Sequence, residues 1–402
     1  MNFNTYETLA LAGFVLLLGY FLVKRISVLK NYNIPEPVVG GFLVAIALTV
    51  LYQGWGISFT FDTNLQTAMM LVFFSSIGLS ANFARLVKGG KPLIIFVIAA
   101  AILIALQNIL GIAGSLLLNI DPAYGLIAGS VTLTGGHGTG AAWAKTFTET
   151  FGLQGATELA MACATFGLVC GGVIGGPVAR HLLKKMGRDE SPENDEQSDI
   201  QEAFEHPTFQ RKITTRSLIE TITMLVCCLL VGQFLDAQTK GTALALPTFV
   251  WCLFTGVIIR NTLTHVFKFN VADSAVDVLG NVGLSLFLAI ALMSLKLWQL
   301  AGLALPVMII LALQVILMAA FAIYVTYRMM GKDYDAVVLS AGHCGFGLGA
   351  TPTAVANMQA ITSRFGPSHK AFLIVPMVGA FFIDLVNAAL LKVFMVVVTA
   401  LH

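Results

Sequence analysis

The sequence predicts an all-α polytopic membrane protein made of two inverted repeats of five transmembrane helices, each repeat with one re-entrant hairpin. Three observations lead to this prediction: a strongly apolar composition, an internal similarity between the two halves, and an uneven distribution of Lys and Arg. Of the 402 residues, 57% are apolar and only 11% are charged. Because soluble domains carry about 25% charged residues, charge is too sparse here to cover a water-facing surface.

Composition also excludes several classes of function. The net charge is only +2 and no basic stripe runs along the chain, which argues against a nucleic-acid partner. No Ser/His or paired-acid arrangement with a plausible spacing occurs, so we expect no enzyme. The six cysteines lie in apolar or Gly-rich segments, where they are expected to be small buried hydrophobes rather than disulfides or metal ligands.

Apolar runs with few or no Asp, Glu, Lys and Arg predict ten spanning helices, because a helix crosses the hydrocarbon with about 20 mostly apolar residues. These runs are 8–23, 37–54, 66–84, 93–118, 159–179, 217–235, 246–259, 278–295, 299–327 and 371–398. The segment 184–216 holds 14 of the 44 charged residues (23 basic plus 21 acidic) and predicts a solvated linker. The expected organisation is therefore a first repeat at 1–183, a linker at 184–216 and a second repeat at 217–402.

The two halves are similar in sequence. DPAYGLIAGSVTLTGGHGTGAA at 121–142 aligns with DYDAVVLSAGHCGFGLGATPTA at 333–354, at an offset of 212 residues. Thr148-x-x-Phe151-Gly152 matches Thr362-x-x-Phe365-Gly366 at an offset of 214. Matches at nearly one offset predict an internal duplication.

The positions of Lys and Arg choose between a parallel and an inverted repeat, since cytoplasmic loops hold most of them. If the two Gly-rich stretches return to the side they enter, and the N-terminus is outside, the inside loops collect 19 of the 23 basic residues. Full crossings would move 180–216 outside with seven of them. We therefore expect re-entrant hairpins at 123–150 and 335–362, both termini outside and a cytoplasmic central loop.

The Gly-rich stretches are candidates for a transport site. Residues 129–142 hold five glycines and residues 342–349 hold four. Glycine permits tight turns and leaves backbone amides open, and free amides at helix N-termini suit a carboxylate. Two such tips entering from opposite faces would meet near the midplane, as in secondary transporters. The alternative is that the glycines only mark helix packing.

The candidate substrate-binding residues come from both stretches. They are Thr134, Gly135, Gly136, His137, Gly138 and Thr139 in the first, and Ser340, Gly342, His343, Cys344, Gly345, Thr351 and Thr353 in the second. For the two histidines, hydrogen bonding is favoured over metal binding because no second strong ligand lies at a suitable spacing, and a proton relay stays open.

An acidic residue inside a span is rare and usually functional. Asp384 lies well inside the last span, and Asn387 follows on nearly the same helical face. The pattern predicts a cation site there. Two alternatives are a partner for a substrate ammonium group and a structural pair with Lys392.

Several motifs carry a resemblance to a known family: GGHGTGAAWAK, GHCGFGLGATPTAVANMQAI, IPEPVVGG, ATELAMACATFGL and VPMVGAFFIDLVNA. With these, the chain closely resembles the bacterial sodium/glutamate symporter family over nearly its whole length. The resemblance implies a homodimer in the bacterial inner membrane that carries L-glutamate by alternating access. It implies sodium as the coupling ion and no other cofactor, which makes Asp384 and Asn387 candidate sodium ligands. It also implies that Gly135 to Gly140 and Gly342 to Gly349 line the translocation site.

Glutamate has two carboxylates, and neither hairpin tip contains Arg or Lys to hold the second. Lys145 and Arg364 flank the tips, and His137 or His343 could donate instead. The alternative function is a sodium- or proton-coupled carrier of another small carboxylate. A channel is disfavoured, because channels usually build their pore from repeats about an axis along the pore.

Overall fold

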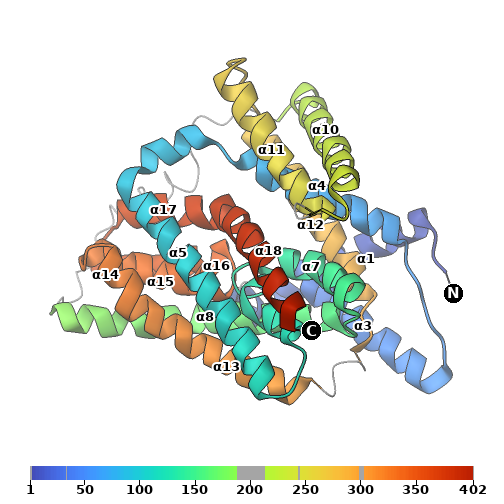
Figure 1. The fold of residues 1–402 in the computed structure, drawn as a ribbon, viewed down its shortest axis with the longest axis horizontal. Helices are drawn as coiled ribbons and strands as arrows, with labels where there is room; N and C mark the ends of the chain where they lie inside the picture. The colour runs from blue at the N-terminus through green and yellow to red at the C-terminus, as the bar shows by residue number, and fades with distance from the viewer. Residues whose placement is uncertain (1, 33, 188–212, 243–244, 298–302, 402) are drawn as a thin grey trace. The chain divides into compact units, whose positions relative to one another are not determined.

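The computed structural model describes residues 2–32, 34–187, 213–242, 245–297 and 303–401, and the regular secondary structure in these ranges is helical (Figure 1). Contacts group the helices into two compact units. Unit 1 consists of residues 1–83, 141–158 and 210–302, and unit 2 of residues 84–140, 159–209 and 303–402. Each unit therefore draws on both halves of the sequence.

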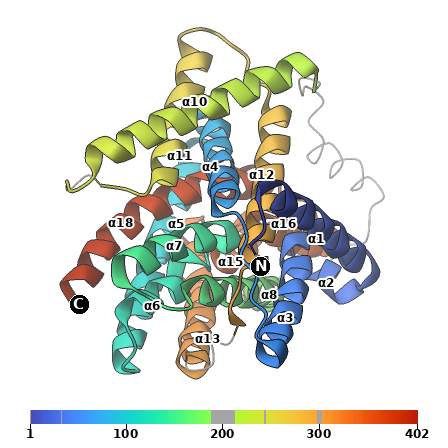
Figure 2. The ribbon, with the colours of Figure 1, turned by 90° about the vertical axis from the view of Figure 1, so that its right-hand side faces the viewer.

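Unit 1 contains the N-terminal helices and those that follow the central linker. They are α1 (Thr5–Arg25), α2 (Ser27–Asn31), α3 (Glu36–Trp55), α4 (Thr63–Ser80), most of α7 (Gly136–Phe151), α10 (Thr215–Thr239), α11 (Thr248–His265) and α12 (Asp273–Met293). Helix α4 packs against α11 and α12, and α10 runs across α4 and α11 (Figure 2). A Cβ on Gly78 would lie 2.1 Å from the carbonyl oxygen of Leu253, so glycine allows α4 and α11 this close approach.

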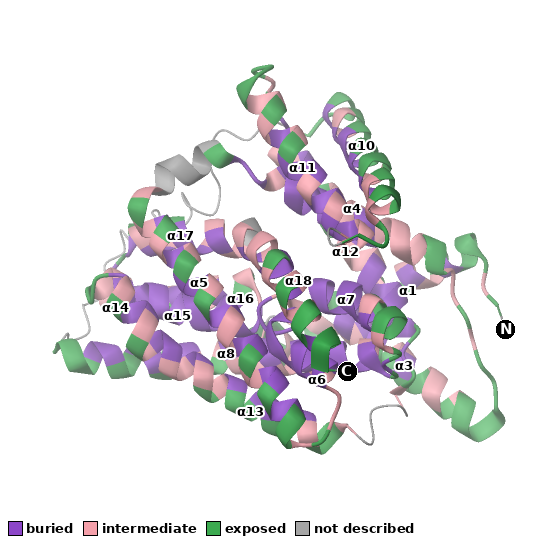
Figure 3. Cartoon of the chain, viewed as in Figure 1, coloured by how far each residue is buried: buried purple, intermediate pink, exposed green. Residues whose placement is uncertain are grey.

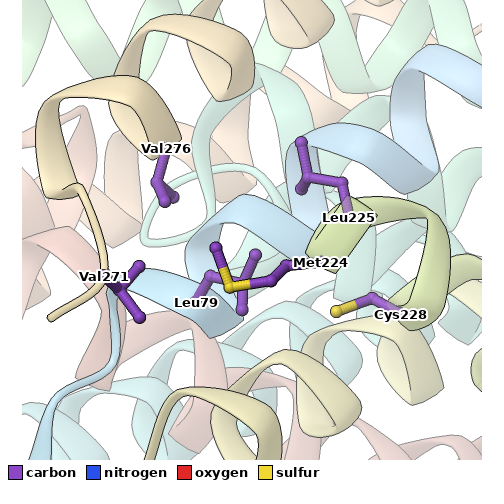
Figure 4. Packing of buried hydrophobic residues seen from close by; sticks show 6 residues of the cluster. All are labelled: Leu79, Met224, Leu225, Cys228, Val271 and Val276. Carbon is purple, nitrogen blue, oxygen red and sulfur yellow. The ribbon is translucent and has the colours of Figure 1, made fainter. Parts of the chain in front are cut away.

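A cluster of buried side chains joins α4, α10 and the start of α12 in this unit (Figure 4). Its members are Leu79, Met224, Leu225, Cys228, Val271 and Val276. All six cysteines are free thiols, of which four are buried, Cys170 is half-buried and Cys227 is exposed. The prediction that the cysteines are small buried hydrophobes is confirmed for four of the six.

The N-terminus of α1 is hydrogen-bonded to Asp62, the residue that caps α4. Asn4 caps α1 in a reciprocal arrangement with Glu7. The Thr5 hydroxyl donates to the Asp62 carboxylate, and the N–H of Asn64 donates to the same side chain at 2.8 Å. These two donors hold the pKa of Asp62 below its ordinary value because they stabilise the ionised carboxylate. The Thr5 hydroxyl has the larger effect and the Asn64 N–H the smaller one.

Unit 2 contains the Gly-rich stretches and the last helices of the chain. They are α5 (Phe83–Leu117), α6 (Pro122–Leu126), η1 (Ile127–Val131), the first residues of α7, α8 (Ala156–Met186) beyond its first turn, α13 (Ala304–Phe321), η3 (Ala322–Thr326), α14 (Tyr327–Met329), α15 (Tyr334–Leu348), α16 (Thr351–Phe365), α17 (His369–Met377), η4 (Val378–Phe382) and α18 (Ile383–Leu401). The three described π-helical turns, η1, η3 and η4, all belong to this unit. Such turns interrupt α-helices and are frequent at functional sites.

Helix α15 lies at the centre of unit 2. Every residue from Ala336 to Leu348 is buried, and α15 is purple over this length in Figure 3. A helix that is covered all round is a core element rather than a surface one. The second Gly-rich stretch is therefore held by neighbours on all sides.

Eight described helices are long and apolar enough to cross a membrane. They are Thr5–Arg25, Glu36–Trp55, Gly90–Leu117, Ala156–Met186, Thr215–Thr239, Asp273–Met293, Ala304–Met329 and Ile383–Leu401. The chain is thus a multi-pass helical membrane protein, as predicted. The expected spans at 66–84 and 246–259 form α4 and α11, which are not among the eight. Most of the predicted linker, 188–212, lies outside the described residues.

Candidate substrate site at two helix breaks

The first Gly-rich stretch folds as a helix, a break and a second helix. Asp121 caps α6 by accepting the N–H of Ala123 at 2.8 Å. Gly129 then leaves helical geometry, with φ −104° and ψ −138°. After the turn at 132–135, α7 begins at Gly136 with φ +66°. Left-handed backbone costs a side chain roughly 1–2 kcal/mol, so the chain needs glycine at the start of α7.

The second Gly-rich stretch forms a helical hairpin. Helix α15 ends at Leu348, Ala350 is extended with φ −157° and ψ 161°, and α16 begins at the next residue. The Nδ2 of Asn357 on α16 donates to the carbonyl oxygen of Ala341 on α15 at 3.2 Å. A Cβ on Gly345 would lie 2.4 Å from the Cα of Ala354. Helix α16 therefore folds back along α15, with glycine at their closest approach.

The two breaks lie next to one another within unit 2. A Cβ on Gly136 would lie 3.3 Å from the carbonyl oxygen of Gly349. The Thr134 hydroxyl donates to Gln107 Oε1 at 2.6 Å, and Gln107 Nε2 donates to the carbonyl oxygen of Gly347 at 2.8 Å. Helix α5 thus contacts both breaks through one side chain.

Both candidate histidines are buried and hydrogen-bonded to threonines. His137 Nε2 lies 3.0 Å from Thr165 Oγ1 on α8, and His343 Nδ1 lies 2.9 Å from Thr326 Oγ1 in η3. Three aromatic rings surround His343: Phe96, Phe321 and Phe346. The Nε2 of His343 has no partner among the described residues. Within the described residues, no group of three or more His, Cys, Asp and Glu side chains lies close enough together to hold a metal ion.

The three candidate hydroxyls of the second stretch, on Ser340, Thr351 and Thr353, lie in different surroundings. Ser340 Oγ donates to the carbonyl oxygen of Ala336 in its own helix at 2.7 Å. Thr351 Oγ1 would lie 2.7 Å from a Cβ on Gly379, so it faces η4. Thr353 is 1% exposed, and its hydroxyl has no partner in the residues that the structure describes. No described side chain caps the N-terminus of α16, so Thr353 and the first amides of α16 are the site's free donors.

The remaining candidates of the two stretches pack tightly against their surroundings. A Cβ on Gly135, Gly342 or Gly345 would lie 3.0 Å or less from a neighbouring atom. Cys344 is fully buried, and Gly138 is buried in the first turn of α7. For Gly135, Gly342 and Gly345, close packing of the breaks is sufficient to account for the absence of a side chain.

Asp384 and Asn387 begin α18 beside the first break. The half-buried Asp384 carboxyl lies within hydrogen-bonding reach of the Thr139 side chain, in the first turn of α7. Asn387 Oδ1 accepts the Ser130 hydroxyl at 2.7 Å, and its Nδ2 donates to the carbonyl oxygen of Ser130 at 3.1 Å. One lone pair of Asn387 Oδ1 stays available. Lys392 lies eight residues from Asp384, about 12 Å along the helix, which makes their predicted pairing a long reach.

The two flanking basic residues, Lys145 and Arg364, are both exposed. Arg364 is exposed in the last turn of α16, about 20 Å along the helix from Thr351. Lys145 is exposed on α7, in the part that belongs to unit 1. The histidines are therefore better placed than Arg364 to meet a second carboxylate.

Sequence reasoning identified some of the polar residues at the breaks and missed others. Sequence reasoning placed Gln107 and Asn108 within the span predicted at 93–118, and both hydrogen-bond to the breaks, with Asn108 Oδ1 accepting the N–H of Ser130 at 3.1 Å. It missed Gln314, whose Nε2 donates to the Gln107 carbonyl oxygen at 2.7 Å, and Asn357, whose Nδ2 also reaches the Gly171 carbonyl oxygen at 2.9 Å. The sequence feature that could have identified Gln314 and Asn357 is an amide side chain within an apolar run, since such a group must find a hydrogen-bond partner.

These features define a multi-pass helical membrane protein with two glycine-rich helix breaks packed against one another, the class to which secondary transporters with discontinuous helices belong. A family profile described as Sodium/glutamate symporter matches residues 1–367. A sodium/glutamate symporter from Haemophilus influenzae is 75% identical over 400 residues, covering 100% of this chain and 99% of that protein. The chain belongs to the sodium/glutamate symporter family.

Two further comparisons agree in length with this chain. A sodium/glutamate symporter from Escherichia coli strain K12 is 57% identical over 394 residues, which cover 98% of each protein. Among solved structures, the sodium proton antiporter MjNhaP1 from Methanocaldococcus jannaschii covers 97% of both chains at 13% identity, with a TM-score of 0.43. That structural similarity is too low to support an argument about the site.

Proposed function

We propose that this chain is a secondary active transporter that carries glutamate into the cell together with sodium, by alternating access. The observation that supports this most strongly is the 75% identity over the full chain to a protein named as a sodium/glutamate symporter. The packed pair of glycine-rich breaks supports it independently, because open amides and hydroxyls suit a carboxylate. The family is one of transporters, so the chain has no enzymatic role in this proposal.

In this proposal, one carboxylate of glutamate binds at the N-terminus of α16. The Thr353 hydroxyl is buried and has no partner within the described ranges, and the first-turn amides carry a partial positive charge. Thr351 and the backbone at Gly349 complete the wall of this subsite. The second carboxylate is held by hydrogen bonds rather than by a cation, with His137 and the Nε2 of His343 as candidate donors.

Sodium, as the co-transported ion, binds beside the first break. Asp384 supplies a carboxylate, and the Thr139 hydroxyl lies within its reach. Asn387 supplies a second oxygen, because its bond with Ser130 uses only one lone pair. Sodium needs several oxygen ligands, and carbonyls released at the π-helical turns are suitable additions. If Asp384 instead holds the ammonium group of glutamate, the charge complementarity is the same but the kinetics differ, as set out in the Discussion.

The wider organisation belongs to the same proposal. Two inverted repeats of five spans, each with one re-entrant hairpin, place both termini outside and residues 184–216 in the cytoplasm. The protein resides in the bacterial inner membrane as a homodimer. The basic residues support the orientation, since 19 of 23 fall on one side of this arrangement.

Counterflow in proteoliposomes tests the proposed function. Vesicles loaded with unlabelled glutamate should accumulate labelled glutamate, and they should do so only when sodium is present. Competition with aspartate, citrate and other small carboxylates separates glutamate from the alternative cargo. Accumulation driven equally well without sodium, or by a pH gradient alone, would favour the proton-coupled alternative.

A further inference from the structure

We infer that Gln107 is a positioning residue that holds the two helix breaks in register and so couples sodium binding to glutamate binding. The coupling part of this inference rests on the proposed function. The positioning part rests on hydrogen bonds alone and can be measured without transport. Gln107 is fully buried in α5 and touches both breaks, which are far apart in sequence.

The side chain of Gln107 uses its two ends for the two breaks. Its Oε1 accepts the hydroxyl of Thr134, which belongs to the turn before α7. Its Nε2 donates to the carbonyl oxygen of Gly347, in the last turn of α15. The Thr134 hydroxyl also lies 3.3 Å from that carbonyl oxygen, which closes a triangle of polar groups.

These bonds are costly to break because of where they lie. Carbonyls in the last turn of a helix have no partner within the helix, so Gly347 depends on an outside donor. In a buried apolar setting, an unmatched carbonyl or amide is unfavourable. Gln107 therefore satisfies the end of α15 and the entry to α7 at once, and neither break can shift without loss of a bond.

Helix α5, which carries Gln107, packs closely against the first break. Asn108 Oδ1 accepts the N–H of Ser130, and a Cβ on Gly111 would lie 2.0 Å from the carbonyl oxygen of Gly125. Helix α5 and the first break thus pack as one piece. Gln314 Nε2 donates to the carbonyl oxygen of Gln107 itself, and no hydrogen bond from Gln314 to either break is seen among the described residues.

The two hydrogen-bond partners of Gln107 lie close in sequence to the two proposed binding groups. Thr134 lies five residues before Thr139, which faces Asp384. Gly347 lies six residues before Thr353, whose hydroxyl has no partner in the described part of the chain. A structural change at either binding group is transmitted to the other through a short stretch of backbone and the Gln107 side chain. Sodium bound beside the first break therefore alters the glutamate site at the second break.

Transport kinetics test the coupling with a matched pair of variants. Q107M keeps the length and apolar volume of the side chain but removes both bonds, and Q314M removes one bond that does not reach a break. We expect Q107M to raise the half-saturation concentrations of both glutamate and sodium by about tenfold, and Q314M to raise each by less than about threefold. Unchanged constants in Q107M, at an equal amount of protein in the membrane, would overturn the coupling.

A double-mutant cycle separates positioning from general loosening. T134V removes the hydroxyl that Gln107 accepts, so the double variant T134V/Q107M should be little worse than Q107M alone. Multiplied defects would mean that the two side chains act independently, which contradicts the inference. Should Q107M fail to insert, T134V alone serves instead, because it removes the bond to the first break and leaves the donor to Gly347 in place; unchanged half-saturation constants in T134V would then overturn the coupling.

The native thiol of Cys344 gives a readout that needs no transport. Cys344 is fully buried in α15, three residues before Gly347. In a variant with Cys344 as its only cysteine, a membrane-permeant maleimide should react with the thiol several times faster when Q107M is added. The reason is that the end of α15 loses its hydrogen bond to α5 and exposes Cys344 more often. Q314M should leave the rate unchanged. Equal rates with and without Q107M overturn the positioning role, whereas absent sodium-dependent counterflow in the wild type would reject the proposed function alone.

Discussion

Gly136, the first residue of α7, packs against the carbonyl oxygen of Gly349, the residue that follows α15. A Cβ built on Gly136 would lie 3.3 Å from that oxygen. These glycines come from the two Gly-rich stretches, so each stretch forms part of the other's wall. A site made this way is sensitive to single methyl groups.

Replacing Gly136 with Ala should abolish uptake while insertion into the membrane persists. The residue has φ +66°, which is strained for any side chain by roughly 1–2 kcal/mol, and its Cβ would press on the second break. Uptake of labelled glutamate in vesicles, normalised to protein amount, measures the effect. Gly176→Ala on α8 is the control, because nothing lies within 4 Å of its Cβ. Wild-type uptake by Gly136→Ala would show that the break tolerates a side chain.

Gly345→Ala should destabilise the hairpin itself. Its Cβ would lie 2.4 Å from the Cα of Ala354, and backbone cannot yield as a flexible side chain does. Overpacking of this kind costs about 1–3 kcal/mol. We expect a lower melting temperature in detergent and less folded protein, which size-exclusion chromatography would reveal. An unaltered melting temperature would mean that α15 and α16 separate easily.

Thr353→Val should raise the glutamate concentration needed for half-maximal uptake and leave the sodium dependence nearly unchanged. The substitution keeps the shape and removes the one donor, a loss worth about 0.5–1.5 kcal/mol or roughly three- to tenfold in affinity. Thr362→Val, on the same helix, is the control, since the Thr362 hydroxyl faces the Gln359 carbonyl oxygen of its own helix. Equal effects of the two variants would remove Thr353 from the carboxylate subsite.

Asp384→Asn should raise the half-saturating sodium concentration far more than that of glutamate. A carboxylate among the ligands lowers the cost of dehydrating the ion, and the amide that replaces it carries no charge. Uptake measured across a series of sodium concentrations, at saturating glutamate, gives the first constant. Thr139→Val should act in the same direction and more weakly, because it removes a neutral oxygen within reach of Asp384.

The same kinetic series distinguishes the two alternatives for Asp384. If the carboxylate holds the ammonium group of glutamate, glutamate affinity collapses at saturating sodium while the sodium dependence stays in place. If Asp384 only pairs with Lys392, the double variant Asp384→Asn with Lys392→Gln recovers activity. Either result would remove the sodium site from this position.

The proposed topology predicts which side of the membrane each loop faces. Single cysteines at Gln238, at the end of α10, should react with an impermeant thiol reagent added to intact cells. Cysteines at Lys30 or Lys332 should react only after the membrane is permeabilised. All three positions are exposed in the structure, so access within the protein is not limiting. Labelling of Lys332→Cys from outside would contradict the inverted arrangement.

Much of the site was predictable because membrane chemistry makes polar residues conspicuous. The apolar runs predict spans, and the density of Gly and Thr at 129–142 and 342–349 predicts backbone that leaves helical geometry. The structure places breaks in both stretches. Asp384 stood out because an acid within a span is expensive. Asn357 and Gln314 did not stand out, since lone amides in spans are common and their partners lie elsewhere in the chain.

The sequence by itself determined the class of the protein, its helices and the two stretches that break them, because burial in hydrocarbon restricts each segment locally. It also carried the family, through motifs that are contiguous in the chain. Only the tertiary structure decided which candidates bind one another: Ser340 bonds its own helix, Thr353 has no partner among the residues that the structure describes, and Gln107 joins Thr134 to Gly347. The bond between Gln107 and Gly347 joins residues that are 240 positions apart in the chain, so it is a property of packing and not of any local pattern.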